Sequence, residues 1–158
     1  MADKDQSMVY AGEHMVEGML SEANREGGAR TVEIAGTMLT LPVERRFASI
    51  DSIQTYVDKV LGLPSVVELY HPGPCRVRER RGNRMAHYCA GVIAIHTASQ
   101  DRWAAREIVV LHELAHHLTN GDGHGSKFRE ALIFLTEICM APEVAFALRV
   151  CWVMSGLK

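Results

Sequence analysis

Two histidines and a glutamate stand at a spacing that suits metal-assisted hydrolysis. The segment His112-Glu113-Leu114-Ala115-His116 places the histidines at positions i and i+4. On a helix the two imidazoles project from one face, one turn apart, so both can bind a single Zn²⁺ at about 2.0–2.1 Å. Glu113 lies about a third of a turn away, where its carboxylate can deprotonate a bound water. The spacing therefore predicts a zinc-dependent hydrolase that cleaves peptide or other amide bonds, with Glu113 as general base.

A catalytic zinc also needs a third protein ligand and one open position. His124 follows the second histidine by eight residues, after an Asn-Gly-Asp-Gly turn where the chain can double back, and it is the preferred candidate. Asp122 occupies the third-ligand position of the pattern HExxHxxGxxH/D, but Thr119 stands where that pattern has glycine. Glu137 lies 21 residues after the second histidine, close to where thermolysin-like enzymes place a ligand glutamate. These residues alone leave Asp122 and Glu137 open as alternatives, and Asp122 could instead orient a ligand histidine.

The residues around the two histidines predict a helix that packs in the protein interior. Residues 108–111 are apolar, and Leu114 and Ala115 are uncharged. A core helix with incidental histidines is the alternative interpretation. Burying two histidines and a glutamate without a metal is costly, however, so the pattern favours a metal site.

The remaining sequence predicts an α+β fold in one domain, with a small and mostly antiparallel sheet. Helices are expected over residues 8–24, 50–61, 101–119, 126–140 and 142–154. Strands are expected over residues 31–41 (two short strands or one bulged strand), 66–70, 76–80, 84–88 and 91–96. A tight turn at Gly82-Asn83 is expected to join the third and fourth of these strand segments.

Composition and charge exclude several classes of protein. Hydrophobic residues make up 47% of the 158 residues, and the net charge of -2 indicates neither nucleic acid nor an anionic membrane as a partner. No run approaches the about 18–20 apolar residues that cross a bilayer, and the polar N-terminal residues do not resemble a secretory signal. The four cysteines (Cys75, Cys89, Cys139 and Cys151) form no CxxC pair. They suit buried, reduced thiols in a cytoplasmic protein better than a disulfide such as Cys139–Cys151.

Residues 112–128, HELAHHLTNGDGHGSKF, resemble the active-site segment of SprT-like metallopeptidases. In that family HExxH is followed, after a loop, by a third histidine in an HGxxF-type motif, which is His124-Gly125-Ser126-Lys127-Phe128 here. The likeness covers about residues 86–140. The loop is short for the family and no cysteine-rich zinc ribbon follows, so the resemblance is to the catalytic core.

The whole chain also resembles a small family of metallohydrolases from actinobacteria and their phages, through Val9-Tyr10 and the segment HYCAGVIAIH at residues 87–96. The chain has no internal repeat or linker, so we expect a single zincin-like domain over residues 1–158. The resemblances imply bound Zn²⁺ but assign no substrate, and the expectation of a peptide or protein substrate rests on the HExxH chemistry. They imply His112, His116 and His124 as metal ligands, with Glu113 as the catalytic base.

In zinc peptidases the edge strand before the HExxH helix pairs with extended substrate, and residues 86–96 occupy that place. His87, Tyr88 and His96 on this segment could donate a hydrogen bond to a developing oxyanion, although a structural role is the preferred interpretation for each.

The alternative function is a DNA-associated or regulatory binding module with little cleavage, or cleavage only of itself. Arg76, Arg78 and Arg80 alternate on one predicted strand and could follow phosphates, although a solvated, charge-protected edge is the preferred interpretation. A structural zinc site is a third hypothesis, and it requires a fourth protein ligand such as Asp122.

Overall fold

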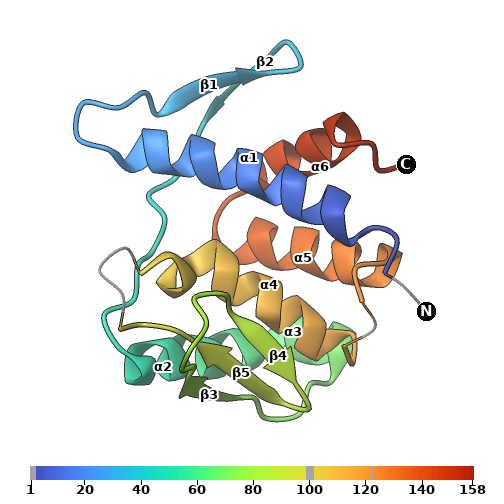
Figure 1. Cartoon of the computed structure of the whole chain (residues 1–158). Coiled ribbons are helices and arrows are strands. Elements are labelled where there is room, and N and C mark those ends of the chain that lie inside the picture. The colour runs from blue at the N-terminus through green and yellow to red at the C-terminus, as the bar shows by residue number, and fades with distance from the viewer. Residues whose placement is uncertain (1–2, 99–101, 122) are drawn as a thin grey trace. The chain divides into compact units, whose positions relative to one another are not determined.

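The structure is a computed structural model that describes residues 3–98, 102–121 and 123–158 (Figure 1). These residues contain six α-helices, one short 3-10 helix and two small sheets, so the predicted α+β fold class is confirmed. The chain divides into two compact units, Met1–Glu44 with Gly123–Lys158 and Arg45–Asp122, and each is described by itself. A single zincin-like domain over residues 1–158 stays a prediction.

Three helices and a β-hairpin make up the first unit. The helices are α1 (Gln6–Asn24), α5 (Ser126–Cys139) and α6 (Pro142–Met154). α6 packs against both α1 and α5 (Figure 1), and the apolar side chains between them are almost fully buried. The hairpin pairs β1 (Thr31–Ile34) with β2 (Thr37–Thr40) in antiparallel register. These elements confirm the three predicted helices and the two short strands expected over residues 31–41.

The contact between α1 and α6 is too close to admit a side chain at Gly12. A Cβ atom at this position would lie 2.4 Å from Cδ1 of Trp152 and 3.1 Å from its backbone nitrogen. The indole is itself buried, and its Nε1 donates a hydrogen bond to the carbonyl of Val9 at 3.2 Å. Trp152 therefore cannot move aside without losing this bond, and glycine is needed where the two helices meet.

We expect Gly12→Ala to lower the free energy of unfolding by about 1–3 kcal/mol, because overpacking forces buried groups to shift. Gly18 is the matched control: it lies exposed on the same helix, and an added Cβ would meet nothing within 4 Å. Gly18→Ala should raise the free energy of unfolding by about 0.5–1 kcal/mol, since alanine loses less backbone entropy in a helix. Urea denaturation measures both changes, and an unchanged midpoint for Gly12→Ala would contradict the close approach.

A three-stranded sheet and its helices make up the second unit. Its elements are α2 (Ile50–Leu61), α3 (Pro64–Tyr70), β3 (Arg76–Glu79), β4 (His87–Cys89), β5 (Val92–Ile95), the 3-10 helix η1 (Trp103–Ala105) and α4 (Glu107–Leu118). The strand order is β3-β5-β4, with β5 parallel to β3 and antiparallel to β4. The central position of β5 agrees with the burial of Ile93, Ala94 and Ile95, each at most 2% exposed. α2 packs against β3 and α4 against β4, so the sheet supports the helix that carries the HELAH segment.

The strand expected over residues 66–70 is wrong, because these residues form the greater part of α3. Val66 and Val67 are β-branched and favour a strand by type alone. Pro64, however, occupies the first turn of the helix, where its missing N–H is not needed. The carbonyl of Leu63 accepts hydrogen bonds from both valine N–H groups, at 3.0 and 2.9 Å. The helix start at Pro64 therefore outweighs the β-propensity of the two valines.

The hairpin expected at the turn around Gly82 does not form, since β3 pairs with β5 instead. Arg80 holds the connecting loop: its Nη1 donates a hydrogen bond to the carbonyl of Met85 at 2.6 Å. The turn between the antiparallel strands β4 and β5 lies at Ala90-Gly91, where φ is 47° and 81°. Alanine rarely adopts positive φ, so its residue type did not indicate this turn.

The single helix expected over residues 101–119 is interrupted. Asp101, its expected first residue, lies outside the described residues. η1 and α4 are separated by Arg106, which is extended (φ -91°, ψ 146°) and pairs with Arg46 in an isolated antiparallel bridge. This backbone pairing draws Arg106 out of helical geometry, so α4 begins only at Glu107.

Glu107 fixes the start of α4 from inside the protein. Its side chain is 1% exposed and accepts hydrogen bonds from the Tyr56 hydroxyl at 2.5 Å and from Nη1 of Arg45 at 2.7 Å. A buried carboxylate with these partners is satisfied, whereas an unpaired one would be costly. The same helix carries the candidate metal ligands one and two turns further along.

The four cysteines all lie in the described part of the chain and form no disulfide, so the Cys139–Cys151 bridge does not exist. Cys75 and Cys151 are buried as expected, and desolvation by burial raises the pKa of the Cys75 thiol to about 11. Cys89 is exposed, contrary to the expectation of four buried thiols.

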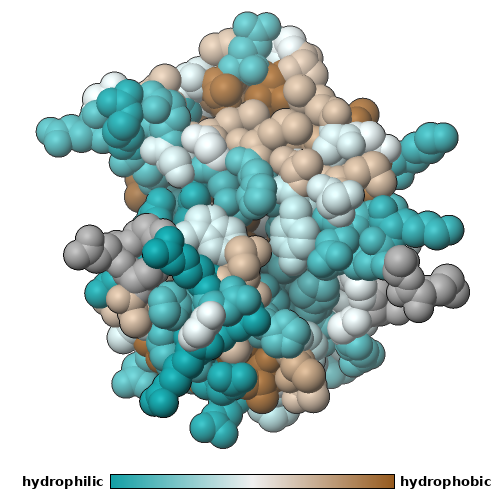
Figure 2. Space-filling view, viewed as in Figure 1, coloured by the Kyte–Doolittle hydropathy of each residue, from teal (hydrophilic) through white to brown (hydrophobic). Residues whose placement is uncertain are grey.

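In the part of the chain that the structure describes, no helix has the length and apolar character needed to cross a membrane. Hydrophilic and apolar residues are interspersed on the face drawn in Figure 2. The large apolar side chains that are exposed belong to different elements, among them Met38 on β2, Leu69 on α3 and Val153 on α6. A cytoplasmic location stays a prediction.

Candidate metal centre

Two of the predicted ligands, His112 and His116, lie next to each other on α4, one helical turn apart. Their ring centroids are 5.0 Å apart and their planes are inclined at 71°. His112 is 5% exposed and His116 is half-buried. Every residue of α4 from Glu107 to Ala115 is buried, because its apolar residues pack on all sides of the helix. The helix therefore presents two imidazoles side by side, one buried and one half-buried.

Glu113 is the next residue of α4 after His112 and is equally buried, at 5% exposure. Successive residues of an α-helix are rotated by about 100°, so its carboxylate leaves the helix beside the two imidazoles rather than between them. A carboxylate kept from water needs polar partners or a nearby cation. Its position is thus compatible with the predicted role of general base.

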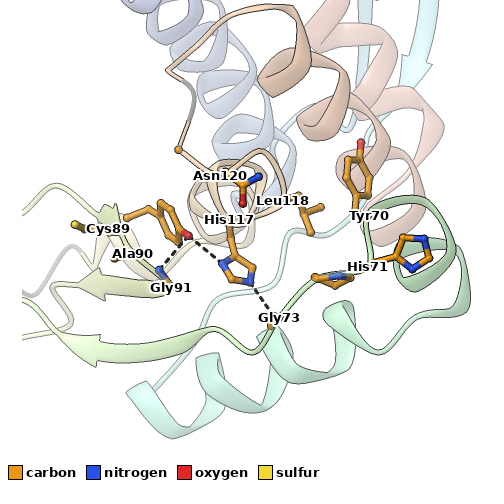
Figure 3. A pocket seen from close by; sticks show the side chains of 12 residues that line it. Tyr70, His71, Gly73, Cys89, Ala90, Gly91, His117, Leu118 and Asn120 are labelled. Carbon is orange, nitrogen blue, oxygen red and sulfur yellow. Dashed lines mark hydrogen bonds between the residues drawn. The ribbon is translucent and has the colours of Figure 1, made fainter.

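Tyr88 of β4 contacts two histidines of α4, His116 and His117. The Tyr88 ring is stacked on His116, with centroids 6.4 Å apart and planes within 11°. Nε2 of His117 donates a hydrogen bond to the carbonyl of Gly73 at 2.8 Å (Figure 3), because a carbonyl only accepts. In the neutral ring Nδ1 then accepts the proton of the Tyr88 hydroxyl, 3.1 Å away, and that oxygen accepts the Gly91 N–H at 3.0 Å. These hydrogen bonds give His117 a structural role.

These hydrogen bonds border a pocket of about 660 Å³ in the second unit. Its lining includes Tyr70, His71, Tyr88, Cys89, His117 and Asn120 (Figure 3). Because Tyr88 lines the pocket and also stacks on His116, the pocket lies next to the ligand helix.

His124 stands just before α5 in the first unit and is 5% exposed. Its Nδ1 lies 2.5 Å from Oδ2 of Asp3, and its backbone N–H donates to the same oxygen at 3.0 Å. A carboxylate only accepts, so Nδ1 carries the proton and Nε2 is the ring nitrogen that can bind a metal. Desolvation raises the pKa of the Asp3 carboxyl, but the hydrogen bonds from His124 and from the Asp5 backbone lower it, and the pKa lies below its usual value.

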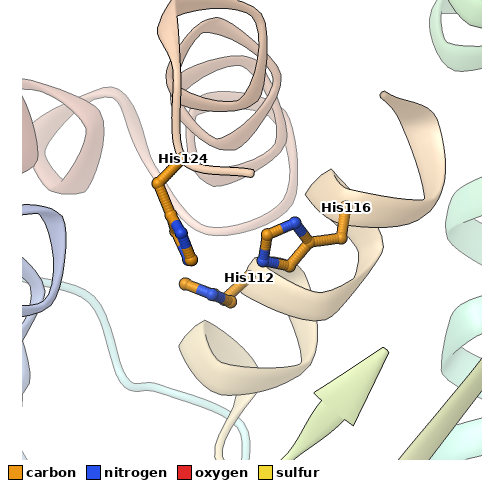
Figure 4. A group of neighbouring side chains, drawn as sticks. All are labelled: His112, His116 and His124. Carbon is orange, nitrogen blue, oxygen red and sulfur yellow. The ribbon is translucent and has the colours of Figure 1, made fainter. Parts of the chain in front are cut away.

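The three predicted ligands form one group. One ligand atom from each of His112, His116 and His124 lies within 4.8 Å of the others (Figure 4), and the group could hold a metal ion. Three imidazoles with no carboxylate or thiolate suit zinc and its transition-metal neighbours rather than calcium or magnesium.

The rival third ligands are not part of this group. Asp122 lies outside the described residues. Glu137 is exposed on α5, where it lines a separate pocket of about 500 Å³ with Arg129 and Arg149. Among the described residues, His124 is therefore the candidate that joins the two histidines of α4.

His87, Tyr88 and His96 were the candidate hydrogen-bond donors to an oxyanion, and the structure gives the surroundings of each. The Tyr88 hydroxyl binds His117, and Nδ1 of His96 donates to the carbonyl of Arg80 at 2.9 Å. His87 is exposed at the start of β4. These positions favour the structural interpretation of Tyr88 and His96.

Asp3 is the residue of the site that the sequence analysis missed. It lies 121 residues before His124, and no local spacing connects the two. An acidic residue near the start of a chain is common and exposed in most proteins, so no signal in the sequence singled it out.

Comparisons of the chain with family models, with curated proteins and with solved structures find no match. The resemblance to SprT-like metallopeptidases therefore stays a prediction.

Proposed function

We propose that this chain is a zinc-dependent hydrolase that cleaves peptide bonds. The observation that carries the proposal is the group of His112, His116 and His124, with the buried Glu113 next to its first member on the same helix. Three protein ligands leave one position open, as in catalytic zinc sites, whereas structural sites use four. Within the described residues the group contains no fourth ligand, which favours a catalytic over a structural metal.

The residues divide the chemistry between them. Zinc at such a site supplies a Lewis acid that polarises a carbonyl and makes water a better nucleophile. Glu113 accepts a proton from the attacking water on its carboxylate and donates it to the leaving nitrogen. The three histidines are neutral ligands, so they would leave the double positive charge of the zinc ion uncompensated and the ion strongly electrophilic. Burial of His112 and Glu113 strengthens both the polarisation and the proton transfer, because the local dielectric is low.

An extended peptide is the substrate class that the neighbouring sheet favours. The strand order of the second unit ends at β4, so one side of this strand faces no other strand among the described residues. A peptide can add to such an edge through main-chain hydrogen bonds. β4 packs against α4, and its Tyr88 stacks on His116. A peptide paired with β4 would thus run beside the ligand helix. Of the segment 86–96, which was predicted to pair with substrate, only β4 is an edge strand, because β5 lies between β3 and β4 in the sheet.

A DNA-associated module is retained as the alternative proposal. Arg76 and Arg78 are exposed on β3, as the predicted alternation requires, but Arg80 lies just after the end of this strand. Arg80 instead holds the loop through the carbonyls of Met85 and Ala86.

Removal and return of the metal test the proposed function. Protein purified without chelators should carry about one equivalent of zinc and cut a mixture of unstructured peptides. Treatment with a zinc chelator should lower the rate by at least about a hundredfold, and stoichiometric zinc should restore it. Protein that neither carries nor binds a metal would overturn the proposal. Protein that binds zinc and cuts no peptide in the mixture would retain the metal centre and reject the peptidase.

A further inference from the structure

We propose that Asp3 is a positioning residue for the metal: it holds His124 in the tautomer and orientation that direct Nε2 toward the ion. The inference rests on the proposed metal centre and adds a residue to it. It concerns the first unit alone, since Asp3 and His124 both belong to that unit.

The Asp3 carboxylate makes several directed contacts with both of its oxygens. Oδ2 accepts from Nδ1 of His124 at 2.5 Å and from its backbone N–H at 3.0 Å, and Oδ1 accepts the Asp5 N–H at 3.3 Å. The two bonds to one oxygen fix the His124 ring relative to its own backbone. A ligand histidine whose second nitrogen is bound to a carboxylate is oriented, kept in one tautomer and made more basic.

Two aromatic rings also pack against the His124 imidazole. The Phe128 ring lies edge-on to His124 with centroids 4.8 Å apart, and the Tyr10 ring is tilted against it at 5.2 Å. Phe128 is 1% exposed and cannot yield easily. The His124 side chain is only 6% exposed. With the ring confined in this way, the bond to Asp3 selects which nitrogen can bind a metal.

An ion pair also connects the segment that contains Asp3 and Asp5 to the start of α5. Nη1 of Arg129 donates to Oδ2 of Asp5 at 2.6 Å and to the carbonyl of His124 at 3.1 Å. The Arg129 side chain is 18% exposed, so this charged pair is partly shielded from solvent. Asp5 thus connects Asp3 to Arg129, and this chain of contacts limits the conformational entropy that Asp3 loses when it orients His124.

The contact also explains why Gly123 precedes the histidine. Its φ is 66°, and a Cβ atom there would lie 3.1 Å from Oδ2 of Asp3. Any other residue at this position would both strain the backbone and crowd the carboxylate. The loop before His124 thus leaves room for Asp3.

Zinc affinity of the full chain, measured by competition with a chromophoric chelator, tests the proposal. We expect Asp3→Ala and Asp3→Asn to weaken zinc binding about 10- to 100-fold, the usual effect of losing a carboxylate partner of a ligand histidine. Asp3→Glu, which keeps the charge, should retain more affinity than Asp3→Asn. Glu33→Gln is the matched control, because it removes one exposed carboxylate from the same unit, and its affinity should equal that of the wild type.

The visible spectrum of Co²⁺-loaded protein gives a second readout, since it reports the geometry of the ligands. We expect it to change in Asp3→Asn and not in Glu33→Gln. Unaltered zinc affinity and an unaltered spectrum in both Asp3→Ala and Asp3→Asn would overturn the proposal, even if their melting temperatures fall, because Asp3 would then only tether the N-terminal segment. Wild-type protein that binds neither metal would instead reject the metal centre itself, and this inference with it.

Discussion

Replacing His116 by glutamine should abolish tight zinc binding, whereas the same replacement at the next residue, His117, should leave it intact. His116 belongs to the candidate ligand group, and a neutral amide is a poor substitute for an imidazole nitrogen. Loss of a residue that hydrogen-bonds a ligand histidine weakens metal binding about 10- to 100-fold. We expect His116→Gln to weaken zinc binding by more than this, because it removes a ligand itself. The two side chains share one helix and are both half-buried, so the pair separates ligation from a general effect on α4.

His117 serves as the control because its nitrogens already have other roles. One binds the Tyr88 hydroxyl and the other the carbonyl of Gly73. His117→Gln should therefore lower stability by about 1–2 kcal/mol, the scale of a lost hydrogen bond, without lowering zinc affinity. Isothermal titration of metal-free protein, together with thermal melts of both variants, measures the two effects separately. Equal loss of zinc in both variants would show that damage to the helix, rather than ligation, explains the result.

Most of the helices and the three-histidine group could be predicted, because each depends on short-range spacing. The i and i+4 positions of His112 and His116 fix their common face on any helix. The apolar run before them agrees with the burial of α4. The group that includes His124 agrees with the third ligand preferred from the sequence. In each case the relevant residues lie within three turns or one loop of each other.

The errors fall where pairing over longer distances decides the structure. Residue types favoured a hairpin at Gly82, yet β3 pairs with β5, and the turn that forms uses Ala90 at positive φ. Val66 and Val67 favoured a strand, and the proline two residues earlier made them helical. Arg106 was expected inside a helix, but its bridge to Arg46 keeps it extended. Strand partners and backbone bridges of this kind leave no local mark in a sequence.

The contact of Asp3 with His124 could not be predicted from the sequence either, because the two residues are far apart along the chain. The partner of a ligand histidine can come from any part of the chain, since only its carboxylate must reach the ring. A spacing argument could suggest Asp122 for this role, because it is close in sequence, but the contact in the structure comes from 121 residues away. Local patterns thus predict metal ligands better than they predict the residues that orient them.

Replacing Glu113 by glutamine should remove the proton transfer and leave the metal in place. The two side chains have nearly the same size, so burial at 5% exposure is preserved and the imidazoles of α4 keep their surroundings. A neutral amide cannot accept a proton from water, so the general base is lost. We expect peptide hydrolysis by Glu113→Gln to fall by about 10²–10⁴-fold, the usual contribution of general acid–base catalysis, with zinc content unchanged.

The comparison of this variant with His116→Gln separates the two roles on α4. Zinc content by atomic absorption and initial rates on the same peptide mixture should give metal without activity for Glu113→Gln, and neither for His116→Gln. Glu113→Asp provides a further control, because it keeps a carboxylate but shortens its reach, and it should recover part of the rate. Full activity in Glu113→Gln would exclude the glutamate as base. Another group would then have to carry the proton, because a histidine that binds zinc through one ring nitrogen is protonated on the other and has no lone pair left to accept it.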